Sequence, residues 1–247
     1  AHYYAEAFDP DRDAVLSALP AAGVGLVLCP GCDLDTSRQS IQLAEAYPHV
    51  YAAAGVHPED ALGLPVDWLD QVAEMTRHPK VKAIGEIGLD YYWKEVPRDL
   101  QKEVFRAQLQ LAKVLDLPVI VHDREAHADC LAIVREFPGV RGVFHCYSGS
   151  AEDAKTLVKL GWHLSFTGTI TFKNARKAPE VIAAVPLERI MVETDAPYMA
   201  PTPFRGKRCD SRYVYRMAET IAEIKGLTPA EVEQATTENG KALFAIP

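Results

Sequence analysis

PVIVHDREAHADCLAIVREFPGVRGVFHC, residues 118–146, contains two apolar runs with an amphipathic stretch between them. PVIVH (118–122) and GVFHC (142–146) have the length and β-branched composition of buried strands, and 124–136 has the spacing of a helix. A strand, a helix and a second strand in this order form the repeating unit of a parallel sheet. Each run also reaches a histidine where the strand is expected to end.

The same alternation continues in both directions from this stretch. Strands are predicted at 25–29, 50–56, 81–86, 118–122, 142–146, 163–168 and 189–195. Helices are predicted at 10–20, 36–47, 66–77, 98–115, 124–136, 151–160, 174–184 and 211–225. Strands that alternate with helices in this way favour an α/β fold with a parallel sheet, and an open sheet of this length is the alternative.

The length of the chain supports a closed barrel. A (β/α)8 TIM barrel typically has roughly 250 residues, and this chain has 247. We therefore predict a single TIM-barrel domain over residues 1–247, with a truncated first strand ending at His2. Residues 228–244 are expected to form two short helices, the first capped by Thr228 with Pro229 at its first position.

Composition and charge exclude several classes of protein. The formal net charge of −8 argues against binding nucleic acid through a broadly basic surface, although Arg205, Lys207, Arg208 and Arg212 form a local basic group. An odd number of cysteines, five, is typical of reduced thiols. No apolar run approaches the ~20 residues that span a bilayer. We expect a cytoplasmic protein without a membrane segment.

Polar residues with metal-binding groups stand at the ends of five predicted strands. In a TIM barrel these ends meet at the C-terminal face, where catalytic groups of this fold lie. A lone histidine or aspartate at a strand end is more often a cap, but two carboxylates and three imidazoles in one buried site would cost several kcal/mol without a cation. The sequence therefore predicts metal ligands at His2, Glu86, His122, His145 and Asp195.

The ligand types restrict the metal without identifying it. Imidazole with carboxylate suits zinc, manganese, iron or nickel, and magnesium prefers fewer nitrogen ligands. Five ligands with a carboxylate that can bridge, Glu86, favour two divalent ions. CPGC at 29–32 resembles half of a structural zinc site, but the other cysteines do not supply the second half, so we interpret it as incidental.

Six motifs, in order along essentially the whole chain, give a specific resemblance. They are GVHP (55–58), GEIGLDYY (85–92), VHDRE (121–125), FHCYSG (144–149), ETDAPY (193–198) and PFRGKR (203–208). With these motifs the chain resembles the TatD family of metal-dependent deoxyribonucleases. The resemblance implies a metal-dependent hydrolase barrel of the amidohydrolase type, the five ligands named above, and Glu86 between two ions. The family begins with HxH, of which His2 is the second histidine; the first would precede residue 1.

The resemblance implies a DNase or exonuclease that acts on DNA ends, with single-stranded DNA as its partner. Glu86 and Asp195 are the expected catalytic residues; Glu86 holds the ions, and Asp195 accepts a proton from the attacking water. His57, Arg124 and Arg205 are the expected phosphate-binding residues. Aromatic residues that could stack on bases are Tyr91, Tyr92, Trp93, Tyr198 and Phe204.

Two other functions remain open at this stage. The same chemistry could serve an esterase or deacylase with another substrate such as D-aminoacyl-tRNA, because activity is portable across one fold. A noncatalytic metal-binding or nucleic-acid-binding protein is the alternative from a different class. The preferred metal, Mg, Mn or Zn, and the oligomeric state do not follow from the sequence.

Overall fold

The computed structural model describes residues 1–247, and the contacts within the chain divide it into two compact units. The middle unit is Leu28–His145, and the terminal unit combines Ala1–Val27 with Cys146–Pro247. Each is described by itself. The single domain over 1–247 stays a prediction.

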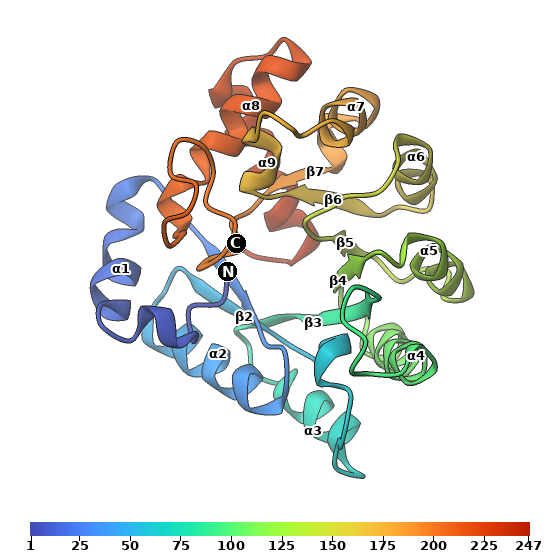
Figure 1. The fold of residues 1–247 in the computed structure, drawn as a ribbon. Coiled ribbons are helices and arrows are strands. Elements are labelled where there is room, and N and C mark those ends of the chain that lie inside the picture. The colour runs from blue at the N-terminus through green and yellow to red at the C-terminus, as the bar shows by residue number, and fades with distance from the viewer. The chain divides into compact units, whose positions relative to one another are not determined.

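The middle unit contains parallel strands with helices between them along the chain (Figure 1). Its strands are β1 (Val27–Pro30, which begins on the last residue of the terminal unit's first segment), β2 (Val50–Ala54), β3 (Val81–Asp90), β4 (Val119–Arg124) and β5 (Gly142–Phe144). Its helices are α2 (Leu34–Ala46), η3 (Pro58–Asp60), α3 (Trp68–Met75), α4 (Arg98–Leu115) and α5 (His127–Glu136). β3 pairs in parallel with β2 and β4, and β4 with β5.

Two glycines let β3 approach β4 closely. A Cβ atom on Gly85 would lie 2.8 Å from the Cβ atom of Ile120. Gly88 has a φ of +143°, and a Cβ atom there would lie 2.0 Å from the carbonyl oxygen of His122. Side chains at these positions would push the strands apart. The glycines on either side of Glu86 therefore allow its strand to pack against the strand of His122.

Buried amide side chains attach α4 to the strands. Gln108, fully buried, accepts a hydrogen bond from the backbone N–H of Val56 (2.8 Å) and donates to the Val56 carbonyl (3.0 Å). Gln101 accepts from the N–H of Asp90 (2.9 Å) and donates to the carbonyls of Asp90 (2.9 Å) and Val96 (3.1 Å). These bonds satisfy backbone groups beyond the regular sheet pairing, and they fix the loop between β3 and α4.

The terminal unit contains two paired strands and all of the remaining helices. β6 (His163–Phe166) and β7 (Ile190–Val192) are parallel. The helices are η1 (Glu6–Phe8), α1 (Arg12–Ala18), η2 (Pro20–Ala22), α6 (Ala151–Lys159), η4 (Gly168–Thr171), α7 (Lys177–Ala184), η5 (Leu187–Arg189), η6 (Ser211–Tyr213), α8 (Tyr215–Lys225) and α9 (Pro229–Leu243).

The C-terminal segment corrects one expectation. It forms one helix, α9, where two short helices were predicted. Thr228 does cap it, in a reciprocal capping box with Glu231. The helix continues through Asn239, whose side-chain amide donates to the carbonyls of Leu187 (2.9 Å) and Ile190 (2.8 Å). This contact compensates for the low helix propensity of asparagine and glycine in the last turns.

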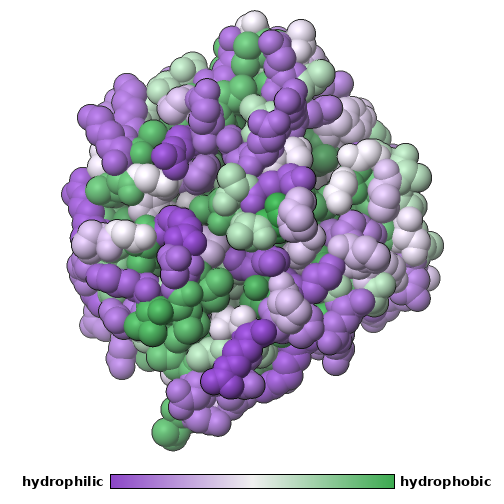
Figure 2. Space-filling model, turned by 180° about the vertical axis from the view of Figure 1, so that it is seen from behind, coloured by the Kyte–Doolittle hydropathy of each residue, from purple (hydrophilic) through white to green (hydrophobic).

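The alternation of seven strands with helices confirms the predicted fold class, a TIM barrel of the metal-dependent hydrolase type. None of the helices combines the length and apolar character that a membrane crossing requires. Figure 2 shows hydrophilic residues over much of one face, with smaller hydrophobic groups between them.

Candidate metal centre

Three of the predicted ligands meet in the middle unit. Glu86 lies in β3, His122 in β4, and His145 directly after β5. The Glu86 Oε1 atom lies 2.6 Å from His145 Nε2 and 2.9 Å from His122 Nδ1, and the two ring nitrogens are 3.3 Å apart. Glu86 is only 3% exposed. Neighbouring parallel strands thus bring these three side chains together, and their role as metal ligands stays a prediction.

The spacing of these donor atoms fits a metal ion. Ligand atoms that bind one ion at about 2.0–2.2 Å stand roughly 3 to 3.5 Å apart, close to the separations found here. A second grouping, His57, Glu86 and His122, has its ligand atoms within 4.8 Å of one another. Two imidazoles and a carboxylate are borderline donors that suit zinc, manganese or iron. The donor set is therefore compatible with a divalent metal.

The charges in this cluster depend on one another. Burial alone would raise the pKa of Glu86, but the positive charge of His145 and hydrogen bonds from His122 and His145 hold the pKa of this carboxyl well below its usual value. For His122, burial would lower the pKa, but hydrogen bonds to Asp90 and Glu86 raise it. The cluster thus favours a permanently ionised Glu86, the form that binds a cation.

Asp90 supports His122 from behind. Asp90 is completely buried, and its Oδ2 atom lies 2.9 Å from His122 Nε2. Despite its burial, the hydrogen bond from His122 and those from the N–H groups of Trp93 and Tyr92 lower the pKa of Asp90. An ionised carboxylate only accepts hydrogen bonds, so His122 Nε2 is the donor. Because Nε2 keeps its proton against Asp90, Nδ1, which donates to Glu86 in the absence of a metal, is the nitrogen that can release its proton and bind one.

Sequence reasoning missed Asp90, although a signal was present. It lies four residues after Glu86 in GEIGLDYY, and residues an even number apart point to the same face of a regular strand. A second buried acid on that face is the pattern of a ligand and its supporting residue.

His57 is held as a neutral hydrogen-bond donor. Its Nδ1 atom accepts a hydrogen bond from the N–H of Glu59 (3.2 Å), which leaves the proton on Nε2. Burial, and then the positive charge of His122, lower the pKa of His57 to about 3. Nε2 lies 3.8 Å from Glu86 Oε1, and the ring packs edge to face on His122 with centroids 4.3 Å apart. Glu86, His122 and His145 are called the metal-ligand cluster below. His57 therefore lies next to this cluster and presents an N–H group on Nε2.

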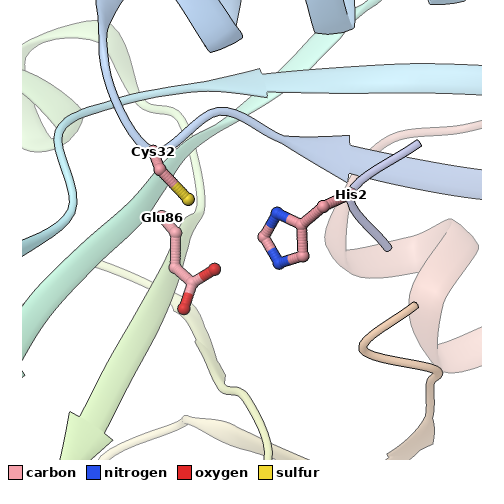
Figure 3. A group of neighbouring side chains, drawn as sticks. All are labelled: His2, Cys32 and Glu86. Carbon is pink, nitrogen blue, oxygen red and sulfur yellow. The ribbon is translucent and has the colours of Figure 1, made fainter. Parts of the chain in front are cut away.

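Cys32 lies close to Glu86, although the sequence analysis interpreted its motif, CPGC, as incidental. In Figure 3 its thiol and the Glu86 carboxylate, both from the middle unit, are drawn together. Their ligand atoms lie within 4.8 Å of each other. Cys32 is also joined to the His57 segment, because its carbonyl accepts from the N–H of His57 (2.7 Å). The CPGC motif thus places Cys32 next to Glu86. The signal in the sequence was that this motif begins where the first predicted strand ends.

The two other predicted ligands meet in the terminal unit. His2 Nε2 lies 3.1 Å from Asp195 Oδ1, and His2 Nδ1 lies 2.9 Å from the Tyr4 hydroxyl. The chain around His2 is fixed by a hydrogen bond from its N–H to the Ala196 carbonyl (2.6 Å). Glu193 accepts hydrogen bonds from the Cys146 N–H and the Ser165 hydroxyl, both 2.7 Å.

The predicted phosphate-binding arginines both lie on aromatic rings. The Arg124 guanidinium is 3.9 Å from the centroid of Tyr92, and that of Arg205 is 4.4 Å from Phe172. Of the local basic group, Arg208 forms a two-pronged ion pair with Asp11, and Arg212 pairs with Asp210. These pairs neutralise part of the group. Phosphate binding by Arg124 and Arg205 stays a prediction.

A TIM barrel that presents imidazoles and carboxylates at metal-ligand spacing defines the class of metal-dependent hydrolases. Within this class the chain belongs to the TatD related DNase family, which matches residues 1–245. The resemblance seen in the sequence is thereby confirmed.

Relatives and a solved structure agree with this assignment. The chain is 44% identical to the uncharacterized metal-dependent hydrolase YabD of Bacillus subtilis, over 100% of this chain and 97% of that protein. It is 33% identical to the 3'-5' ssDNA/RNA exonuclease TatD of Citrobacter rodentium, over 97% of this chain and 94% of that protein. The crystal structure of YjjV, a TatD homologue from Escherichia coli K12, is similar with a TM-score of 0.93 and 34% identity, covering 100% of this chain and 96% of that one.

Proposed function

We propose that this hydrolase cleaves phosphodiester bonds and removes nucleotides from the ends of single-stranded DNA or RNA. The observation that carries the proposal is the convergence of Glu86, His122 and His145 within 3.3 Å of one another in a buried cluster. The name of the Citrobacter rodentium relative, a 3'-5' ssDNA/RNA exonuclease, supports the choice of substrate.

We propose His2, Glu86, His122, His145 and Asp195 as the metal ligands, with two divalent ions, Mg, Mn or Zn. When bound, such ions lower the pKa of water and neutralise charge on the phosphate oxygens. His57, neutral and protonated on Nε2, donates to a nonbridging phosphate oxygen. Asp195 accepts the proton of the attacking water. Arg124 and Arg205 contact the flanking phosphates, because a guanidinium matches the geometry of phosphate oxygens.

The test compares ligand variants with a matched control. Glu86→Ala and Asp195→Asn are assayed on labelled single-stranded DNA, RNA, duplex DNA and a phosphodiester dye, after reconstitution with Mg, Mn or Zn. Glu233→Gln, an exposed acid in α9, is the control. We expect both ligand variants to lose at least 100-fold in activity and to bind less metal by elemental analysis, with unchanged circular dichroism.

Two outcomes would contradict the proposal. Retention of most activity by Glu86→Ala would remove the metal-ligand assignment. Turnover of carboxylic esters or aminoacyl esters, with none of nucleic acids or the dye, would assign the site to a deacylase.

A further inference from the structure

A cavity in the middle unit lies beside the metal-ligand cluster. It has a volume of about 290 Å³ and is lined by Glu59, Trp93, Glu95, Val96 and Gln101. This volume is near the lower end of pockets that hold small molecules. One wall is an indole ring, and two of the other lining residues are acidic. We call it the Trp93 pocket.

Exposed aromatic rings lie at Trp93, which lines the pocket, and at its neighbour Tyr92. Tyr92 and Trp93 are 47% and 46% exposed, and their rings pack edge to face with centroids 4.9 Å apart. The Arg124 guanidinium lies 3.9 Å from the Tyr92 centroid and 6.0 Å from that of Trp93. Exposed rings beside a guanidinium are the surface on which proteins stack unpaired bases.

Asp90 connects the pocket with the metal-ligand cluster. Its Oδ1 atom accepts hydrogen bonds from the N–H groups of Tyr92 (2.9 Å) and Trp93 (3.1 Å), and its Oδ2 atom binds His122. One rigid carboxylate therefore fixes the aromatic pair relative to a metal-ligand histidine.

The charge of the pocket selects the part of a nucleotide that it can take. Glu59 and Glu95 repel a phosphate group. No hydrogen bond or ion pair within the protein engages the Glu59 carboxylate, whose pKa is raised by partial burial and by the charge of Asp90. Both carboxylates are exposed and can accept hydrogen bonds from a ligand. The exocyclic amino groups of adenine, cytosine and guanine are such donors, whereas thymine and uracil lack these groups.

We propose that the Trp93 pocket is a nucleobase subsite, in which Trp93 stacks on an unpaired base and Glu59 and Glu95 favour bases that carry an exocyclic amino group. The backbone phosphate of the same nucleotide faces Arg124. The subsite deepens the proposed function and rests on it for its place in catalysis. Binding of the base itself needs no metal.

The first experiment measures binding to the metal-free protein by equilibrium dialysis. The probes are labelled dCMP, dAMP and dTMP, with deoxyribose 5-phosphate as the ligand without a base. We expect dCMP and dAMP to bind more tightly than dTMP, and deoxyribose phosphate weakest. Trp93→Ala should weaken dCMP binding on the order of 10-fold, the size of one stacking contact. Trp68→Phe, another tryptophan of the middle unit, is the control and should bind normally.

A second pair of variants tests the acidic residues. In the double variant Glu59→Gln/Glu95→Gln, the neutral amides can donate hydrogen bonds as well as accept them. The ratio of the dissociation constants for dTMP and dCMP should therefore fall to about one. Melting temperatures of all variants show whether each protein is folded. On oligonucleotides, Trp93→Ala should raise KM for strands ending in dC, whereas the control Trp68→Phe should leave this KM unchanged.

The outcomes separate this inference from the proposed function. Equal binding of all four probes, or unchanged dCMP binding and unchanged KM in a folded Trp93→Ala protein, would overturn the subsite. Base-selective binding that depends on Trp93, in a protein without nuclease activity, would support the subsite and contradict the proposed function.

Discussion

The support that Asp90 gives to His122 leads to a specific prediction for Asp90→Asn. Asparagine has the shape of aspartate, and its oxygen can still accept hydrogen bonds from the N–H groups of Tyr92 and Trp93. Its NH2 group then faces His122 Nε2, 2.9 Å away in the native protein. Because this group donates, Nε2 must accept, and the imidazole then holds its only proton on Nδ1. Nδ1 is the nitrogen that lies 2.9 Å from Glu86.

The expected loss of metal affinity follows from the loss of the hydrogen bond between His122 and the Asp90 carboxylate. Removing an outer partner of a metal-binding histidine costs 10- to 100-fold in metal affinity, which is about 1.4 to 2.7 kcal/mol. Complete burial of Asp90 excludes water as a replacement and favours the upper part of this range. Asp90→Ala should in addition lower the free energy of unfolding, because it leaves the loop N–H groups without their acceptor.

Metal affinity is measured by titration with Zn or Mn, and stability by urea unfolding of the metal-free proteins. Asp99→Asn, which removes the same charge from the exposed start of α4, is the control. Asp90→Asn should lose affinity with little change in stability. If it binds metal as tightly as the control, Asp90 does not set the tautomer of His122.

Three further predictions concern the middle unit. Gly88→Ala should strongly destabilise the protein in urea, because its Cβ atom would clash with the His122 carbonyl at a φ of +143°. Gln108→Leu should cost about 2 to 5 kcal/mol by the same measurement, since both backbone groups of Val56 lose their partners. Burial and the charge of Asp33 raise the pKa of Asp60 from 3.8 to about 6. The stability that the protonated Asp60 contributes is therefore fully present below pH 3.8 and is lost as the pH rises through 6. Asparagine resembles the protonated form, so Asp60→Asn should raise the melting temperature at about pH 7.5 and not at about pH 3.5. An equal shift at both values would contradict this.

The periodicity of strands and helices was enough to predict much of the fold and part of the candidate site from the sequence. The predicted helix 98–115 coincides with α4, on whose buried face Phe105, Leu109 and Ala112 recur at helical spacing. Glu86, His122 and His145 could be placed together because parallel neighbouring strands end on the same side of a sheet. Both inferences need only local pattern and the geometry of a parallel sheet.

Other features depend on side-chain contacts that no local pattern encodes. Gln108 meets Val56 across 52 positions, and Gln101 meets Asp90 across 11. A glutamine on a helix is usually read as a solvent-facing residue, and only coordinates reveal its backbone partners. The ion pair of Arg208 with Asp11 likewise joins positions 197 apart, which is why this arginine was counted with an open basic group.

Gln101 also has a consequence for the evolution of the Trp93 pocket. Its amide joins both ends of the segment between Asp90 and Val96, so the length of that segment is set by a single side chain. An inserted residue would have to bulge outward or release one of these bonds. We expect proteins that keep this glutamine to diversify their ligand preference by exchanging side chains at the positions of Trp93 and Glu95, at constant loop length.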